Sequence, residues 1–156
     1  MSIVENTELS FSRVFDAPRA LVWKAWTDPS HIEQWWGPNG FTGQSCKMDL
    51  RAGGQFDLTL CAPDGTSYPC RGMFHEIVEL ERIVYDGEVA DGHPCGAGLP
   101  PHSRVTVTFA ERNRQTTLTL HTSFISAAQR EAATQAGYRQ GWEDSLQRLA
   151  TFLQSH

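Results

Sequence analysis

The sequence predicts an α+β fold in which a curved, seven-stranded antiparallel sheet surrounds a long C-terminal helix. Three observations predict it. One alternating segment precedes two short helical segments, six further alternating segments follow them, and the last part of the chain carries a helical apolar stripe. Because no helix separates the six later strands, neighbours along the chain pair antiparallel. The expected order is β-α-α-β6-α, in a single domain over residues 1–156.

The N-terminal part of the chain contains one strand and two short helices. Apolar and polar side chains alternate over residues 7–15, which is typical of a half-buried strand. Pro18 begins a helix that reaches Trp26, because proline in the first helical turn costs no hydrogen bond. Asp28 and Pro29 begin a second helix in the same way, with Asp28 as its N-cap.

Six strands in hairpin order follow the helices. Turn signals separate them, among them Gly53-Gly54 and Pro63-Asp64-Gly65, and a Gly/Pro-rich loop over residues 90–101. Within each strand one parity is apolar, so one face of the sheet is expected to be buried. The strands are expected at residues 44–50, 55–60, 67–78, 82–89, 105–109 and 117–121.

The last helix begins at Ser126, whose spacing to Gln129 matches a capping box. Gly137 is a candidate break between two helical pieces. The stripe must be buried, and a bent sheet is the available partner. A single helix does not fill the concavity of seven strands, so we expect an apolar cavity at one end of it. The stripe is formed by Tyr138, Trp142, Leu146, Leu149, Phe152 and Leu153.

The composition argues against several classes of function. Net charge is −5 and the basic residues are scattered, which argues against a nucleic-acid partner. No apolar stretch approaches the roughly 20 residues that span a bilayer, so no membrane partner is expected. The first residues lack the pattern of a signal peptide, which makes the cytoplasm the expected compartment. The four cysteines are therefore expected to be free thiols.

Several segments resemble the heat-shock-ATPase-activator-homologue family, a branch of the START-like (SRPBCC) superfamily of helix-grip domains. The resemblance covers nearly the whole chain. It implies the helix-grip fold, with a pocket that holds varied ligands in different members. The matching segments are residues 13–18, 22–29, Trp35-Trp36-Gly37-Pro38, 49–54, 72–77, 81–83, 105–109 and Gly141-Trp142-Glu143-Asp144-Ser145-Leu146.

Candidate ligand-binding residues follow from the expected cavity. Two adjacent tryptophans on a short helix cannot both point into one core, so we expect Trp35 and Trp36 at the cavity entrance, stacked on a planar ligand. Ordinary packing is the alternative for this pair and the favoured interpretation for Trp23 and Trp26. Tyr85, Tyr138, Arg13 and His75 are the candidate polar groups. The candidate binding residues are Trp35, Trp36, Phe56, Leu58, Phe74, Tyr85, Phe109, Leu118, Tyr138 and Trp142.

Three functions remain open. The first is binding of a hydrophobic, aromatic or lipid-like molecule for sensing, sequestration or transport. The second is an enzyme of the cyclase or dehydratase type on a polyketide-like substrate, for which Asp57, Glu76 and Glu131 are the candidate carboxylates. The third, implied by the resemblance, is a stress-response module that binds a heat-shock chaperone. No catalytic residue is singled out and no cofactor is expected.

A metal site has one weak candidate. Imidazole and thiolate ligands suit zinc, and the Gly/Pro-rich loop and its end contain Asp91, His93, Cys95 and His102. Their spacing matches no defined metal motif, and we therefore predict no metal.

Overall fold

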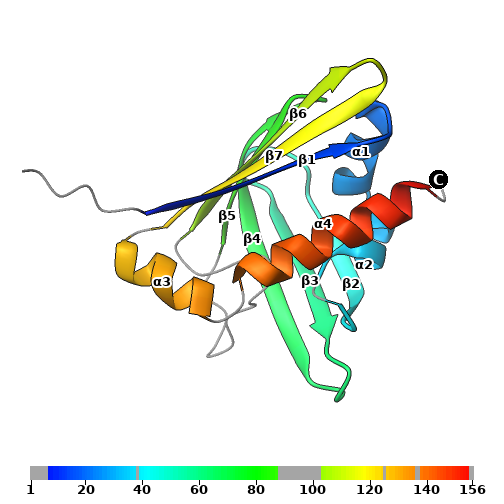
Figure 1. Cartoon of the computed structure of the whole chain (residues 1–156). Coiled ribbons are helices and arrows are strands. Elements are labelled where there is room, and N and C mark those ends of the chain that lie inside the picture. The colour runs from blue at the N-terminus through cyan, green and yellow to red at the C-terminus, as the bar shows by residue number, and fades with distance from the viewer. Residues whose placement is uncertain (1–6, 38, 88–102, 125, 136–137, 155–156) are drawn as a thin grey trace, which may run out of the picture.

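Seven antiparallel strands form one sheet in the order β1-β7-β6-β5-β4-β3-β2 (Figure 1). This is seen in the computed structural model, which describes residues 7–37, 39–87, 103–124, 126–135 and 138–154. All strand neighbours are antiparallel, as predicted. The strands are β1 (Glu8–Phe15), β2 (Thr42–Met48), β3 (Gln55–Cys61), β4 (Ser67–Val78), β5 (Arg82–Gly87), β6 (Arg104–Arg112) and β7 (Gln115–Ser123).

In the described part of the chain, four helices accompany the sheet. Figure 1 shows α4 lying across the sheet, with α1 and α2 near the C-terminal end of α4. The predicted C-terminal helix is present as two helices on either side of residues 136–137, which lie outside the described part of the chain. The Ser126 hydroxyl accepts a hydrogen bond from the backbone N–H of Gln129 at 3.1 Å, so the predicted cap is confirmed. The helices are α1 (Arg19–Thr27), α2 (Pro29–Trp35), α3 (Ala127–Gln135) and α4 (Tyr138–Gln154).

The corner between α1 and α2 depends on Asp28 and Pro29. The Asp28 carboxylate accepts hydrogen bonds from the Ser30 hydroxyl at 2.7 Å and the Ser30 N–H at 3.0 Å, and these bonds lower the pKa of Asp28. Proline has no N–H, so Pro29 cannot donate to the carbonyl of Ala25 one turn earlier. The indole Nε1 of Trp35 donates to that carbonyl instead, at 2.9 Å. A side chain of α2 therefore supplies a hydrogen bond that α1 lacks.

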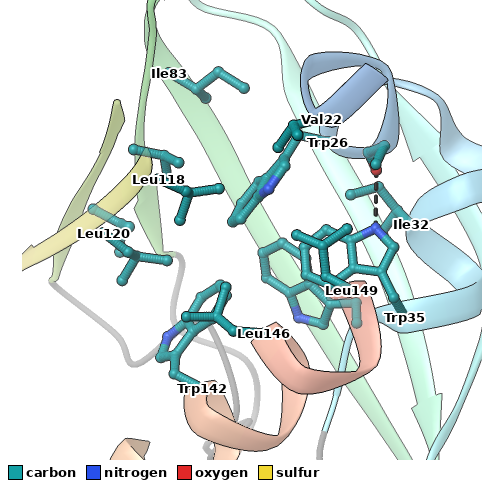
Figure 2. Close-up of a cluster of buried hydrophobic side chains, with 14 of the residues drawn as sticks. Val22, Trp26, Ile32, Trp35, Ile83, Leu118, Leu120, Trp142, Leu146 and Leu149 are labelled. Atoms are coloured by element: carbon teal, nitrogen blue, oxygen red, sulfur yellow. Dashed lines mark hydrogen bonds between the residues drawn. The ribbon is translucent and has the colours of Figure 1, made fainter. Parts of the chain in front are cut away.

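The space between α4 and the sheet is filled with side chains. Trp26 of α1 stacks on Trp142 of α4, with ring centroids 5.9 Å apart. Leu146 and Leu149 pack beside them (Figure 2). Except for Tyr138, whose side chain lies outside the described part of the chain, the predicted stripe of α4 is buried. The predicted core positions of the sheet are buried as well: Phe56, Leu58, Leu60, Phe74, Tyr85, Val107, Phe109, Leu118 and Leu120.

One expectation about the adjacent tryptophans is wrong. Trp35 and Trp36 are both buried, with 0% and 4% of their surfaces exposed, and their ring centroids lie 5.4 Å apart. The reason is local: α2 ends at Trp35, and Trp36 has the extended dihedral angles φ −69° and ψ 133°. Because Trp36 is outside the helix, helical geometry does not direct its side chain away from that of Trp35.

Candidate functional site

An apolar cavity lies between α2 and the concave face of strands β2 to β5. Its volume is about 20 Å³, which is close to the space that one water molecule occupies. No described residue of α4 lines it, so the cavity expected between the sheet and the terminal helix is found instead beneath α2, and it is small. The lining side chains are Trp26, Ile32, Trp36, Cys46, Met48, Phe56, Leu58, Cys70, Phe74, Ile83 and Tyr85.

Aromatic rings form much of the cavity wall. Phe56 of β3 lies 5.0 Å from Phe74 of β4 and 5.3 Å from Tyr85 of β5, measured between ring centroids. The Trp36 ring lies 6.4 Å from that of Tyr85. Because side chains alternate along each strand, Phe56, Phe74 and Tyr85 lie on one face of the sheet. The period-two pattern of the sequence therefore accounts for this part of the cavity wall.

Three buried tryptophans of this region have no hydrogen-bond partner for the indole N–H among the described residues: Trp26, Trp36 and Trp142. The ring centroid of Trp36 lies 5.5 Å from that of Trp26 and 5.0 Å from that of Trp142. A buried donor without a partner costs roughly 1–3 kcal/mol. Trp26 and Trp36 line the cavity. Two of the side chains that line this mainly apolar cavity thus carry a buried donor with no partner among the described residues.

The edge of the cavity lies where α2 covers β2. Cys46 and Met48 are half-buried there, on a strand at the end of the sheet. Ser45 has a left-handed φ of 55°, at the point where the register of β2 shifts. The backbone N–H of Cys46 donates to the Glu33 carboxylate at 2.9 Å. A Cβ on Gly43 would lie 2.7 Å from the Glu33 carbonyl oxygen. Glycine therefore allows α2 to rest directly on β2.

Helix α4 fixes the segment that follows α2. The buried Ser145 hydroxyl accepts a hydrogen bond from the N–H of Gly37 at 2.9 Å. The Arg148 guanidinium donates to the Gly37 carbonyl at 3.0 Å, and burial lowers the pKa of Arg148. Asp144 accepts from the N–H of Asn39 at 3.2 Å. These contacts hold the residue next to Trp36 and so position its ring against the cavity.

The cavity is electrically neutral in its described part. Burial, followed by the charges of Glu33, Asp57 and Asp28, raises the pKa of the Cys46 thiol to about 12. Cys46 is therefore protonated at neutral pH and is a poor nucleophile. None of the described lining side chains is a carboxylate, an amine or an imidazole.

The three candidate carboxylates lie outside the cavity lining. Asp57 forms an ion pair with Arg71 at 3.0 Å, and Glu76 forms one with Arg82. Glu131 is exposed on α3. The sequence-based candidates for acid–base catalysis are thus not brought together at this site.

The prediction of four free thiols is wrong. Cys46 and Cys61 are free, but Cys70, in the cavity wall, is disulfide-bonded. The prediction was drawn from an expected reducing compartment and not from the places of the cysteines in the fold, which decide whether a bond can form.

Five of the predicted binding residues meet at the cavity: Trp36, Phe56, Leu58, Phe74 and Tyr85. Four others are buried in the core but do not line it: Trp35, Phe109, Leu118 and Trp142. Tyr138 begins α4, and its side chain lies outside the described part of the chain. The sequence reasoning missed Trp26, Ile32, Cys46, Met48, Cys70 and Ile83. Parity was the available signal for Ile83, which has the same parity as Tyr85 along β5.

The remaining polar candidates lie elsewhere. Arg13 donates to Gln147 of α4 at 2.8 Å, and His75 is exposed. The metal candidates at positions 91, 93, 95 and 102 lie outside the described residues. Within the described ranges, no three His, Cys, Asp or Glu side chains are grouped to hold a metal ion. No described helix combines the length and the apolar character needed to cross a bilayer.

Known proteins share this architecture. A search of curated proteins found no match. A solved structure from Nitrosomonas europaea is similar over 96% of this chain and 95% of its own, with a TM-score of 0.84 and 23% identity. One from Mycobacterium smegmatis gives 99% and 98% coverage, a TM-score of 0.84 and 22% identity.

An AHSA1-like protein from Aeromonas hydrophila is 21% identical, with a TM-score of 0.70 over 95% of this chain and 92% of its own. At these identities the likeness shows the fold. The sequence profile described as "Activator of Hsp90 ATPase homolog 1-like protein" matches residues 16–154. The chain therefore belongs to the family of activator of Hsp90 ATPase homolog 1-like proteins, with the START-like, helix-grip fold.

Proposed function

We propose that this protein binds a small, planar, apolar molecule that carries a hydrogen-bond acceptor, in the cavity beneath α2. The observation that carries the proposal is that two side chains lining this mainly apolar cavity, Trp26 and Trp36, have buried indole donors without a partner among the described residues. Ligand pockets combine apolar walls with a few polar groups that orient the ligand. An acceptor atom within reach of either indole would recover the cost of the unpaired donor.

Binding requires the cavity to open, because about 20 Å³ does not hold an aromatic ring. The movable side is β2, which among the described strands pairs with β3 alone and contains a bulge. Met48 has an unbranched side chain that adopts other rotamers easily. The closed form described here is then the ground state, and the measured affinity is the intrinsic affinity reduced by the fraction of open molecules.

Binding without chemical conversion is the version that the geometry supports. The described lining contains no group that titrates near neutral pH, and the Cys46 thiol stays protonated. A cyclase or dehydratase needs an acid or base at the reacting atoms. No specific observation favours this alternative, and the cavity is better suited to sensing, sequestration or transport of its ligand.

The test uses two ligands of one shape, 2-acetylnaphthalene and 2-ethylnaphthalene, which differ in the acceptor oxygen. Each is titrated into the protein and into Trp36→Phe, with amide chemical shifts as the measurement. We expect saturable shifts at residues of β2 to β5 that line the cavity. The ketone should bind about tenfold more tightly than the hydrocarbon to the wild type, which corresponds to about 1.4 kcal/mol, and the preference should shrink in Trp36→Phe.

Trp35→Phe is the matched control, because its indole donates to Ala25 and does not line the cavity. It should keep the preference for the ketone. Absence of saturable shifts at the cavity for either ligand would count against a binding role. Equal affinities for ketone and hydrocarbon would count against the role of the indole donors.

A further inference from the structure

The free edge of β1 is a second feature that requires explanation. The Thr7 carbonyl accepts from the N–H of Phe124, beside β7, whereas the Glu8 carbonyl accepts from the Arg130 side chain at 2.9 Å. The backbone groups of successive residues point to opposite sides of a strand, and the register with β7 is unbroken. The N–H and C=O groups of Ser10 and Ser12 therefore point away from β7, to the open edge of the sheet.

A groove of about 460 Å³ runs along this edge, between β1 and α4. One wall is formed by residues 10–13 of β1 and the other by Arg139, Glu143 and Leu146 of α4. Side chains of consecutive strand residues alternate between the two faces of the sheet. Four consecutive residues therefore line one groove only if the groove follows the edge of the sheet. The groove thus presents backbone groups that have no partner among the described residues, together with the side chains of a helix.

Two arginines give the groove its charge. The Arg139 guanidinium lies 5.4 Å from the centroid of the Phe11 ring, and that of Arg13 lies 5.7 Å from the Phe15 ring. Arg13 also donates to the neutral side chain of Gln147. In the described part of the chain neither guanidinium is paired with a carboxylate within 4.0 Å, whereas Arg51, Arg71, Arg82 and Arg104 are. Two positive side chains face one negative side chain, Glu143, in a protein of net charge −5.

We propose that this groove binds an extended, acidic segment of another protein, which adds to the sheet as an eighth strand beside β1. Backbone hydrogen bonds to Ser10 and Ser12 would supply affinity, and carboxylates would pair with Arg13 and Arg139. The two guanidiniums lie over Phe11 and Phe15, whose side chains share one face of β1, so they suit acidic residues that lie on that same face of the added strand, at every second position. A second copy of this chain fits poorly, because an edge-to-edge pair would oppose arginine to arginine.

The test uses a fluorescein-labelled heptapeptide, Thr-Val-Glu-Val-Glu-Val-Thr with blocked ends, and fluorescence anisotropy with the full chain. Two matched peptides accompany it, one with glutamine in place of glutamate and one with N-methylated amides along the pairing edge. We expect saturable binding of the acidic peptide, at least tenfold weaker binding of the glutamine peptide, and no binding of the methylated one. The double variant Arg13→Gln/Arg139→Gln should weaken binding at least tenfold.

Arg51→Gln is the control variant, because Arg51 is exposed and paired with Asp49 away from the groove. It should bind the acidic peptide as the wild type does. Equal binding of the methylated peptide would overturn strand addition, and equal binding by the double arginine variant would overturn the assigned site. Lack of saturable binding by all peptides, or dimerisation of the protein through β1 in sedimentation experiments, would overturn the proposal as a whole. None of these results depends on the cavity beneath α2.

Discussion

Replacing Trp36 or Trp35 with phenylalanine should have opposite consequences for stability, although the two residues are adjacent and almost equally buried. Each substitution leaves a void of roughly 40 Å³, which costs about 1 kcal/mol at roughly 24 cal/mol per Å³. The two differ in the fate of the indole N–H. That of Trp35 is bonded to the Ala25 carbonyl at 2.9 Å, and that of Trp36 has no partner among the described residues.

The change in hydrogen bonding decides the sign. Trp35→Phe loses a bond and leaves a buried carbonyl unpaired, which adds about 1–3 kcal/mol to the cost of the void. Trp36→Phe removes an unpaired donor, which offsets the void by about 1–3 kcal/mol. We therefore expect Trp35→Phe to lower the free energy of unfolding by about 2–4 kcal/mol. Trp36→Phe should lie between no change and about 2 kcal/mol of added stability.

Urea unfolding of the ligand-free protein, followed by circular dichroism, measures both quantities. Thermal unfolding gives a second measure, at roughly 2–4 °C per kcal/mol for a domain of this size. The reasoning is refuted if Trp36→Phe destabilises the protein as much as Trp35→Phe does. The Trp36 donor would then be satisfied in the folded protein, for example by a water molecule in the cavity, and would not be available to a ligand.

Three further predictions concern the surroundings of the cavity. Gly43→Ala should destabilise the fold by about 1–3 kcal/mol in urea unfolding, because the new Cβ would lie 2.7 Å from the Glu33 carbonyl oxygen; a neutral effect would show that α2 shifts easily. Thiol titration of the unfolded protein should detect two of the four cysteines before reduction and four after it. In the native protein at pH 8, Cys46 should be alkylated more slowly than Cys61, because the pKa of the Cys46 thiol is raised to about 12. Asp28→Ala should lower the free energy of unfolding by about 1 kcal/mol at pH 7. Because the pKa of Asp28 is lowered in the folded state, this stabilisation is present above about pH 4 and is lost on acidification. The difference in stability between variant and wild type should therefore narrow towards pH 2, and a constant difference would contradict the assigned cap.

The fold was largely predictable because its signals are local. Alternation along the strands and the spacing of the α4 stripe are properties of short segments, and each buried face follows from its own period. Trp36 was misplaced because the end of α2 at Trp35 sets its direction, and helix ends are hard to locate from sequence.

The cavity was predictable in its wall but not in its place or size. A void is a small difference between the volume that the backbone encloses and the volume that side chains fill. Stacking of Trp26 on Trp142 uses the space that was expected to stay open. The partner of the Trp35 indole, in contrast, could have been inferred, since Pro29 shows in the sequence that Ala25 lacks a helical donor.

The proline between the first two helices also has a consequence for movement. The Trp35 indole replaces the missing amide donor of Pro29, so it joins α1 and α2 into one rigid unit. Helix α4 holds the end of this unit through its hydrogen bonds to Gly37. We therefore expect the apolar cavity to open by movement of the edge strand β2, while α1 and α2 stay fixed. Deuterium should enter the amides of β2 well before those of the two helices.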